Sequence, residues 1–370
     1  MLRKCPGISR MRRNLGYIYP LKNKRLGHGK NLLPEVRITL TNHHLKTYYP
    51  TINLLRGVAA LSVCLYHFIG YEDFRGDLFA SNSLTSDLAN FGVNGIFLFF
   101  VISGFVIPFS LAKADFKLTR LHRFLSRRFI RIEIPYLASI LFILAIGVLF
   151  AFKNNTNVSF SFERFIYHIF YVIPFSSFEW YNVIYWTLAI EFQFYFVIGL
   201  LFYFLSSHRK FTVLFALLIF GFSSFLVPDN RFVFHYATIF SQGIILFLIK
   251  TNRVGSKTGL LCIGAFVLAT AYLHSIEVSV FSVLTLCAIH FLEIDTKMTN
   301  RFGDISYSFY LTHGFIGGNV LYFFSRYVTS YSGKMALVIL AVTASFVFAF
   351  IFWRYIENPA RKLSMKINDA

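Results

Sequence analysis

The sequence predicts an all-α integral membrane protein, a polytopic bundle of about ten transmembrane helices with both termini in the cytoplasm. Hydrophobic residues make up 56% of the 370 residues and charged residues only 14%, a balance far from that of a soluble domain. Apolar runs of membrane-spanning length recur, and basic residues gather in short clusters between them. We therefore attribute the net charge of +19 to membrane topology, and we expect no nucleic-acid partner.

Ten apolar segments are expected to cross the bilayer. They cover residues 52–72, 91–111, 134–152, 182–205, 211–228, 231–249, 258–274, 276–293, 304–328 and 334–356. Residues 163–175 are apolar too, but the segment is short and Pro174 ends it, so we interpret it as an interfacial or re-entrant piece. With this choice every basic cluster falls on the cytoplasmic side, and loops 72–90, 153–181 and 329–333 fall outside.

Three regions follow from this pattern. Residues 1–50 carry eleven Lys or Arg against one acid, Glu35, and are expected to form a basic cytoplasmic tail. Residues 51–357 form the ten-helix transmembrane domain, and residues 358–370 form a short cytoplasmic C-terminal tail. The four cysteines show no metal-binding spacing, so no metal site is expected.

The first apolar segment contains two ionisable residues, Arg56 and His67. Eleven helical steps of about 100° return to within about 20° of the starting face, which places the two side chains on one stripe about 16 Å apart. Ionisable groups inside a bilayer are costly unless they face a protein or water cavity. This segment is therefore expected to contribute to a functional site.

Other polar residues are expected at a similar depth. Glu191 is the only acid predicted near the middle of a span, Ser103 and His313 fall at about the same level, and Tyr310 shares a helix face with His313. Such groups must find one another or water in lipid. His313 as a hydrogen-bonded core histidine is the competing interpretation, and the glycines in FGVNG and SGF are expected to mark close helix contacts.

Arginines form a second set near the cytoplasmic rim, where Arg56, Arg128 and Arg131 are expected. Arg128 and Arg131 are three residues apart and are neighbours if that stretch is helical. Guanidinium groups are suited to bidentate recognition of phosphate, which favours a phosphorylated ligand here. A role of Arg128 and Arg131 in topology alone is the alternative.

The chain resembles the acyltransferase 3 family of membrane O-acyltransferases. Six motifs occur in the family's order over residues 52–363: LRGVAALSVCLYHF, FFVISGFVI, RRFIRIEIPY, WTLAIEFQFYF, SYSFYLTH and YIENPARKL. The resemblance implies transfer of an acyl group, usually acetyl, from acetyl-CoA to a hydroxyl of a cell-surface glycan or another carbohydrate-containing acceptor, free or lipid-linked. It also implies that Arg56 and His67 are an essential pair and that Arg128 and Arg131 assist binding of the CoA phosphates. Acetyl-CoA would be a co-substrate, with no bound cofactor.

General-base catalysis is the mechanism expected for such a site. Imidazole titrates close to neutral pH, so His67 is the predicted base that accepts the proton of the acceptor hydroxyl. Glu191 is predicted to orient that ring, and Ser103, Tyr310 and His313 are the candidates for substrate or oxyanion contacts. A covalent acyl-enzyme intermediate stays open.

Two other function classes remain open from the sequence. The first is a proton-coupled transporter or flippase of a lipid-linked sugar, in which Glu191 and His67 would form a proton relay. The second is a sensor or scaffold without catalysis. Acyl-CoA, a carbohydrate acceptor and membrane lipids are the expected partners, and a bacterial inner membrane is the expected location, with a eukaryotic membrane as the alternative.

Overall fold

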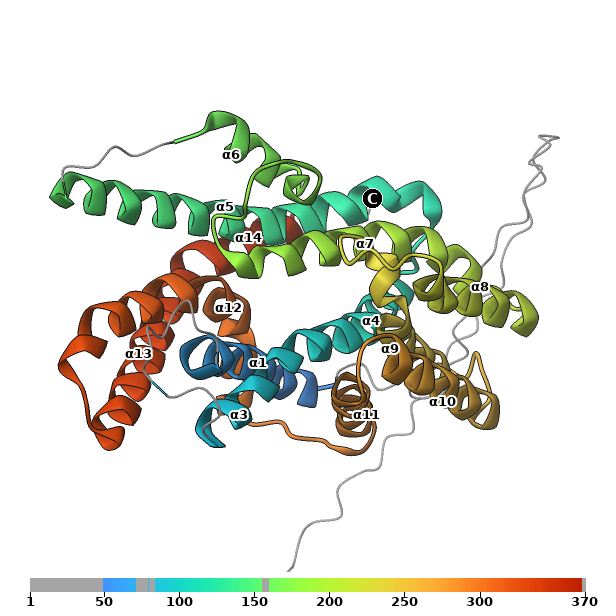
Figure 1. Ribbon diagram of the computed structural model, residues 1–370. Helices are drawn as coiled ribbons and strands as arrows, with labels where there is room; N and C mark the ends of the chain where they lie inside the picture. Colours follow the sequence, from blue (N-terminus) through green and yellow to red (C-terminus); the bar gives the residue numbers. More distant parts are fainter. Residues whose placement is uncertain (1–48, 71–78, 80–83, 155–159, 368–370) are drawn as a thin grey trace, which may run out of the picture. The chain divides into compact units, whose positions relative to one another are not determined.

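The computed structural model describes residues 49–70, 79, 84–154 and 160–367 (Figure 1). Within these ranges the chain forms helices and turns and no strand. The predicted basic tail lies almost wholly outside the described residues, as does most of the expected external loop 72–90. The prediction of an all-α fold is confirmed for the described part of the chain.

Most of the described part of the chain is helical. Their bounds are α1 Thr51–Leu65, α3 Leu84–Asn90, α4 Gly95–Lys113, α5 Leu121–Asn154, α6 Phe162–Ile169, α7 Trp186–Leu205, α8 Lys210–Phe222, α9 Ala237–Lys250, α10 Ser256–Leu273, α11 Ile276–Phe291, α12 Lys297–Phe324, α13 Tyr331–Phe352 and α14 Asn358–Met365. Two π-helical turns, Tyr66–Gly70 and Trp353–Glu357, directly continue α1 and α13. Short 3-10 turns precede α7 at Val183–Tyr185 and α9 at Val233–Tyr236.

Each of the ten expected segments coincides with a helix. Among the described residues, seven helical stretches are long and apolar enough to cross a membrane, and those at Lys210–Phe225 and Ile276–Phe291 are apolar but shorter. The remaining expected segment, 304–328, corresponds to α12, which is 28 residues long and begins with polar residues. A multi-pass membrane protein is therefore supported, while the count of ten spans and the cytoplasmic placement of both termini stay predictions.

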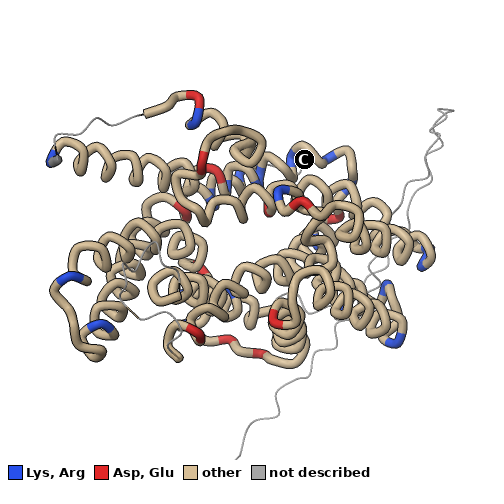
Figure 2. Tube along the Cα trace, viewed as in Figure 1, with Lys and Arg blue, Asp and Glu red and all other residues tan. Residues whose placement is uncertain are grey.

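Charged residues lie mainly at the ends of the helices. Figure 2 shows Lys and Arg at the tips of several helices, as the sequence pattern indicated, and a separate basic group along the first half of α5. Residues 163–175 form the eight-residue helix α6 and a 3-10 turn at Ile173–Phe175. This segment is thus too short to span a bilayer as a helix, which agrees with the interpretation as an interfacial or re-entrant piece.

The helices pack around a shared interior. α12 lies between α1 and α13, α4 lies between α1 and α9, and α5 and α7 run side by side (Figure 1). Glycines permit the closest approaches, because a Cβ atom added to Gly104 would lie 2.2 Å from the carbonyl oxygen of Phe240, and one added to Gly95 would lie 2.5 Å from that of Ala59. The prediction that the FGVNG and SGF glycines mark close helix contacts is confirmed.

Candidate active site

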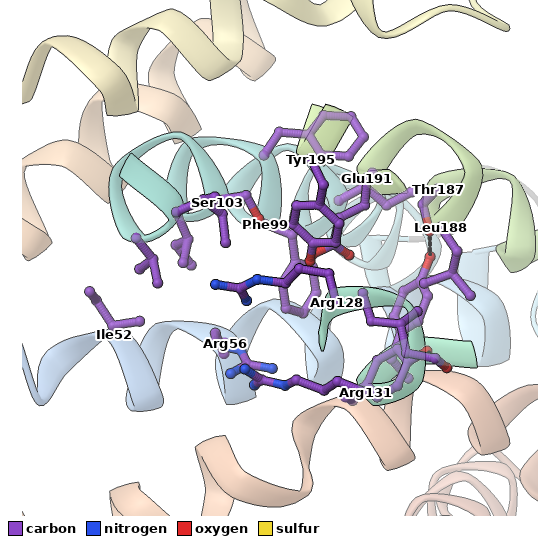
Figure 3. A pocket seen from close by; sticks show the side chains of 18 of the residues that line it. Ile52, Arg56, Phe99, Ser103, Arg128, Arg131, Thr187, Leu188, Glu191 and Tyr195 are labelled. Atoms are coloured by element: carbon purple, nitrogen blue, oxygen red, sulfur yellow. Dashed lines mark hydrogen bonds between the residues drawn. The ribbon is translucent and has the colours of Figure 1, made fainter. Parts of the chain in front are cut away.

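A cavity lies where α1, α4, α5, α7, α12 and the Trp353–Glu357 turn meet (Figure 3). Its volume is about 130 Å³. Apolar side chains form most of its wall, and polar groups from all six elements line it. The polar and aromatic lining residues are Arg56, Phe99, Phe100, Ser103, Arg128, Arg131, Thr187, Glu191, Tyr195, Tyr307, Tyr310 and Glu357. This arrangement is typical of a ligand site.

Three guanidinium groups gather in this cavity. Arg56 comes from α1, and Arg128 and Arg131 are neighbours on α5, whose helical conformation the prediction required (Figure 3). The guanidinium carbon of Arg128 lies 5.4 Å from the ring centre of Tyr195 and 5.5 Å from that of Phe124. Stacking on two rings limits the rotamers of Arg128 and holds its donors in place.

Two carboxylates partly balance these cations. Tyr195, one helical turn after Glu191 on α7, donates a hydrogen bond to its Oε1. Glu357 lies in the second π turn and accepts hydrogen bonds from the backbone N–H and the hydroxyl of Ser308, at 3.1 and 2.6 Å. With three arginines and two glutamates in their usual charge states, the lining carries an excess of one positive charge. An anionic ligand suits this balance.

His67 and His313 form a buried pair beside this cavity. Nδ1 of His67 lies 2.9 Å from Nε2 of His313, and the rings stack at 5.2 Å between centres. The second ring nitrogen of His313 lies 3.1 Å from the carbonyl oxygen of Phe309. Because a carbonyl only accepts, that Nδ1 carries a hydrogen, and in neutral rings Nε2 of His313 must then accept from Nδ1 of His67. The proton-accepting nitrogen of the pair is thus Nε2 of His67.

The predicted site residues therefore separate into two groups. Arg56, Ser103, Arg128, Arg131, Glu191 and Tyr310 line one cavity, whereas His67 and His313 do not line it. The ring partner at Nδ1 of His67 is a histidine, where Glu191 was expected. His67 lies in the π turn that follows α1, so the uniform 100° step used to place it on the stripe of Arg56 does not hold there.

Tyr310 lies between these two groups. Its ring lines the cavity, and its centre is 6.1 Å from that of His313. The hydroxyl lies 2.8 Å from Oγ1 of Thr187 and 3.1 Å from the carbonyl oxygen of Ile184. This hydroxyl is thus engaged by the start of α7, and its use as an oxyanion donor would require one of these bonds to open.

Several residues of the site were not predicted from the sequence. Glu357 and Tyr307 line the cavity, and Glu133, in α5, is only 3% exposed. Glu133 does not line the cavity and lies one residue before the expected span 134–152, so the expectation that Glu191 is the only acid near the middle of a span stays a prediction. Glu357 directly precedes Asn358 and Pro359 in the last of the six motifs. An acidic residue at the end of an apolar helix was the sequence feature from which Glu357 could have been predicted as a site residue. The described residues contain no cluster of three or more metal-ligating side chains.

The comparisons with known proteins agree with this picture of a membrane enzyme. A family model described as an acyltransferase domain matches residues 49–354. No curated protein and no solved structure matches the chain. The matched region contains Arg56, Ser103, Arg128, Arg131 and Glu191, together with the buried histidine pair. The chain therefore belongs to the acyltransferase 3 family and is a membrane acyltransferase.

Proposed function

We propose that this enzyme transfers an acetyl group from acetyl-CoA to a hydroxyl of a cell-surface glycan or another carbohydrate-containing acceptor. The convergence of three guanidinium groups in one cavity is the observation that carries the proposal. Phosphates of the CoA moiety are anions that arginine forks bind in bidentate geometry. In this assignment Arg128 and Arg131 hold the phosphates, and Arg56 supports the acyl-bearing end.

His67 is the proposed general base. Its Nε2 takes the proton of the acceptor hydroxyl as that oxygen attacks the carbonyl carbon of the thioester. The new C–O bond forms, the C–S bond breaks, and the proton passes to the sulfur of the departing CoA. His313 orients the ring through the 2.9 Å contact to Nδ1, the role that we expected for Glu191.

The carboxylates are proposed to organise the donor site. Glu191 and Glu357 contribute negative charge among the arginines, and each is held by a hydroxyl group of its own partner. Ser103 lines the same cavity and is the proposed donor to the oxyanion that develops on the thioester carbonyl. The two carboxylates would offset the mutual repulsion of the guanidinium groups until the phosphates enter.

Acetyl transfer by purified protein in lipid nanodiscs tests this function. With radiolabelled acetyl-CoA and a surface-glycan extract as acceptor, we expect labelled glycan from the wild type and at least about a hundredfold less from His67→Ala. His122→Ala is the matched control, because that histidine is exposed. Wild-type rates from a correctly inserted His67→Ala protein would refute the assignment of the base.

The donor site needs a separate test. Arg128→Ala with Arg131→Ala should raise the apparent KM for acetyl-CoA by at least about tenfold, the loss expected when charged hydrogen bonds to phosphate are removed. Arg209→Ala is the control, since Arg209 is exposed outside the cavity. An unchanged KM would return Arg128 and Arg131 to a role in topology. Movement of a lipid-linked sugar without label incorporation would instead favour the transporter alternative.

The location follows from the proposed substrates. Acetyl-CoA is made in the cytoplasm, and surface glycans are assembled at the cytoplasmic membrane of bacteria. The protein is therefore proposed to reside in a bacterial inner membrane, with acyl-CoA, the carbohydrate acceptor and membrane lipids as its partners.

A further inference from the structure

A second hollow lies on the opposite face of α7 from the arginine cavity. It is lined by Pro174, Trp180, Trp186, Ala189, Ile190, Asn230, Arg231 and Tyr236, and we call it the α7 groove. Its volume is about 290 Å³, close to the lower end of the range for small-ligand sites. Neither the matched family domain nor the proposed chemistry assigns a role to it.

The spacing of residues on α7 separates the two hollows. Thr187, Leu188 and Glu191 face the arginine cavity, whereas Ala189 and Ile190 face the groove. At about 100° per residue these sets point to opposite sides of one helix. The groove is therefore not an extension of the donor site, and a ligand in it would lie across α7 from the cavity.

Aromatic rings form the wall and floor of the α7 groove. Trp180 and Trp186 are half-buried, and Tyr236 is 5% exposed. The ring centres of Trp186 and Tyr236 lie 5.8 Å apart. Two of the three tryptophans of the chain therefore line a single hollow. Flat aromatic surfaces of this kind pack against the C–H faces of sugar rings while leaving the hydroxyls at the edge.

The polar rim of the groove is rigid and nearly neutral. Arg231 is held by the carboxylate of Asp229, with its Nη2 2.6 Å from Oδ2 and its Nε 2.9 Å from Oδ1. The side-chain amide of Gln193 donates to the carbonyl of Arg231 and accepts from the N–H of Val233, each at 2.9 Å. Because Asp229 neutralises the guanidinium, the rim offers hydrogen bonds without a free charge. A neutral ligand suits it better than a phosphate or a carboxylate.

From these observations we infer that the α7 groove binds a neutral oligosaccharide, the part of the acceptor glycan remote from the reacting hydroxyl. The identification of the sugar as the acceptor rests on the proposed function. The aromatic rings stack on the sugar, and Asn230, whose side chain is exposed at the rim, bonds to its hydroxyls. In the topology expected from the sequence this end of α7 lies outside, where glycans are found. Binding energy from such a remote segment positions the reacting end of a long substrate.

Tryptophan fluorescence in lipid nanodiscs tests the inference without any acetyl transfer. Trp353→Phe leaves Trp180 and Trp186 as the only emitters, and nanodiscs avoid competition from sugar-based detergents. This protein is titrated with maltotriose, cellotriose and N-acetylchitotriose. We expect at least one of them to change the emission saturably, and we expect Trp180→Ala and Asn230→Ala to weaken that binding by at least about tenfold.

Two control variants keep the outcomes distinct. Tyr272→Ala removes an exposed ring outside the groove and should leave sugar binding unchanged. Arg128→Ala should raise the apparent KM for acetyl-CoA and keep sugar binding. If none of the three sugars changes the emission, or if Tyr272→Ala weakens binding as much as Trp180→Ala, the inference is overturned. An emission that responds only to lipid composition would identify these rings as an interfacial aromatic belt. Sugar binding by a wild type that transfers no acetyl would contradict the proposed function alone.

Discussion

Replacement of Gly243 by alanine should separate α4 from α9 and destabilise the protein. A Cβ atom at this position would lie 2.1 Å from the carbonyl oxygen of Val101 and 2.7 Å from the backbone nitrogen of Phe105. The first contact is about 1.3 Å closer than the 3.4 Å at which ordinary contact begins. Because the opposing atoms are backbone, one helix must move as a unit. Overpacking of this kind costs about 1–3 kcal/mol.

The assay compares the apparent Tm in detergent and the rate of acetyl transfer. We expect Gly243→Ala to lower the apparent Tm by about 2–10 °C, and to lower the rate as well, because Ser103 lies on α4 beside this contact. Gly264→Ala in α10 is the matched control, since a Cβ there meets nothing within 4 Å. If Gly243→Ala is as stable as Gly264→Ala, the close approach of α4 and α9 is wrong.

Three further predictions concern buried polar groups. Ser308→Ala removes the 2.6 Å hydrogen bond to Glu357 and should reduce the free energy of unfolding by about 1.5–3 kcal/mol, measured by denaturation in mixed micelles; an unchanged value would argue that the bond is not formed. His313→Ala should lower kcat by at least about tenfold while the KM for acetyl-CoA stays constant, since His313 orients His67 without touching the donor site; a rise in KM alone would contradict this role. Burial and the charge of Arg164 lower the pKa of His168 to about 3, so the unfolded chain binds a proton below about pH 6.5 that the folded protein does not. The wild type should therefore lose more stability than His168→Gln as the pH falls from neutral towards about 5, and equal losses would refute the assignment.

The helices were predictable because length and hydropathy decide them. All ten expected segments coincide with helices, and the differences are at their ends. The start of α12 is an example: it begins at Lys297, seven residues before the expected segment. Thr296 caps this end, with its side chain accepting from the N–H of Thr299 and the side chain of Thr299 accepting in return. A capped polar first turn adds no hydropathy, so a search for apolar runs does not find it.

The cavity was predictable where one helix determined the position of a side chain. Arg128 and Arg131 are neighbours because they are three apart on a regular helix, and Glu191 and Tyr195 meet because they are four apart. The pairing of His67 with His313 joins residues 246 positions apart. Such a contact depends on how α1 and α12 pack, and neither local spacing nor depth in the membrane determines it.

The two π turns hold two residues whose contacts the sequence did not predict, and they point to α12 as their common support. Each turn contains a buried ionisable residue, His67 in Tyr66–Gly70 and Glu357 in Trp353–Glu357. Each of these residues bonds to α12, His67 at His313 and Glu357 at Ser308, five positions apart. A π turn is less favourable than an α-helical turn, so it persists where surrounding contacts stabilise it. The hydrogen bonds to α12 are contacts of this kind. The position of the proposed base relative to the arginine cavity therefore depends on α12, and a change in the packing of this helix would disturb His67 and Glu357 together.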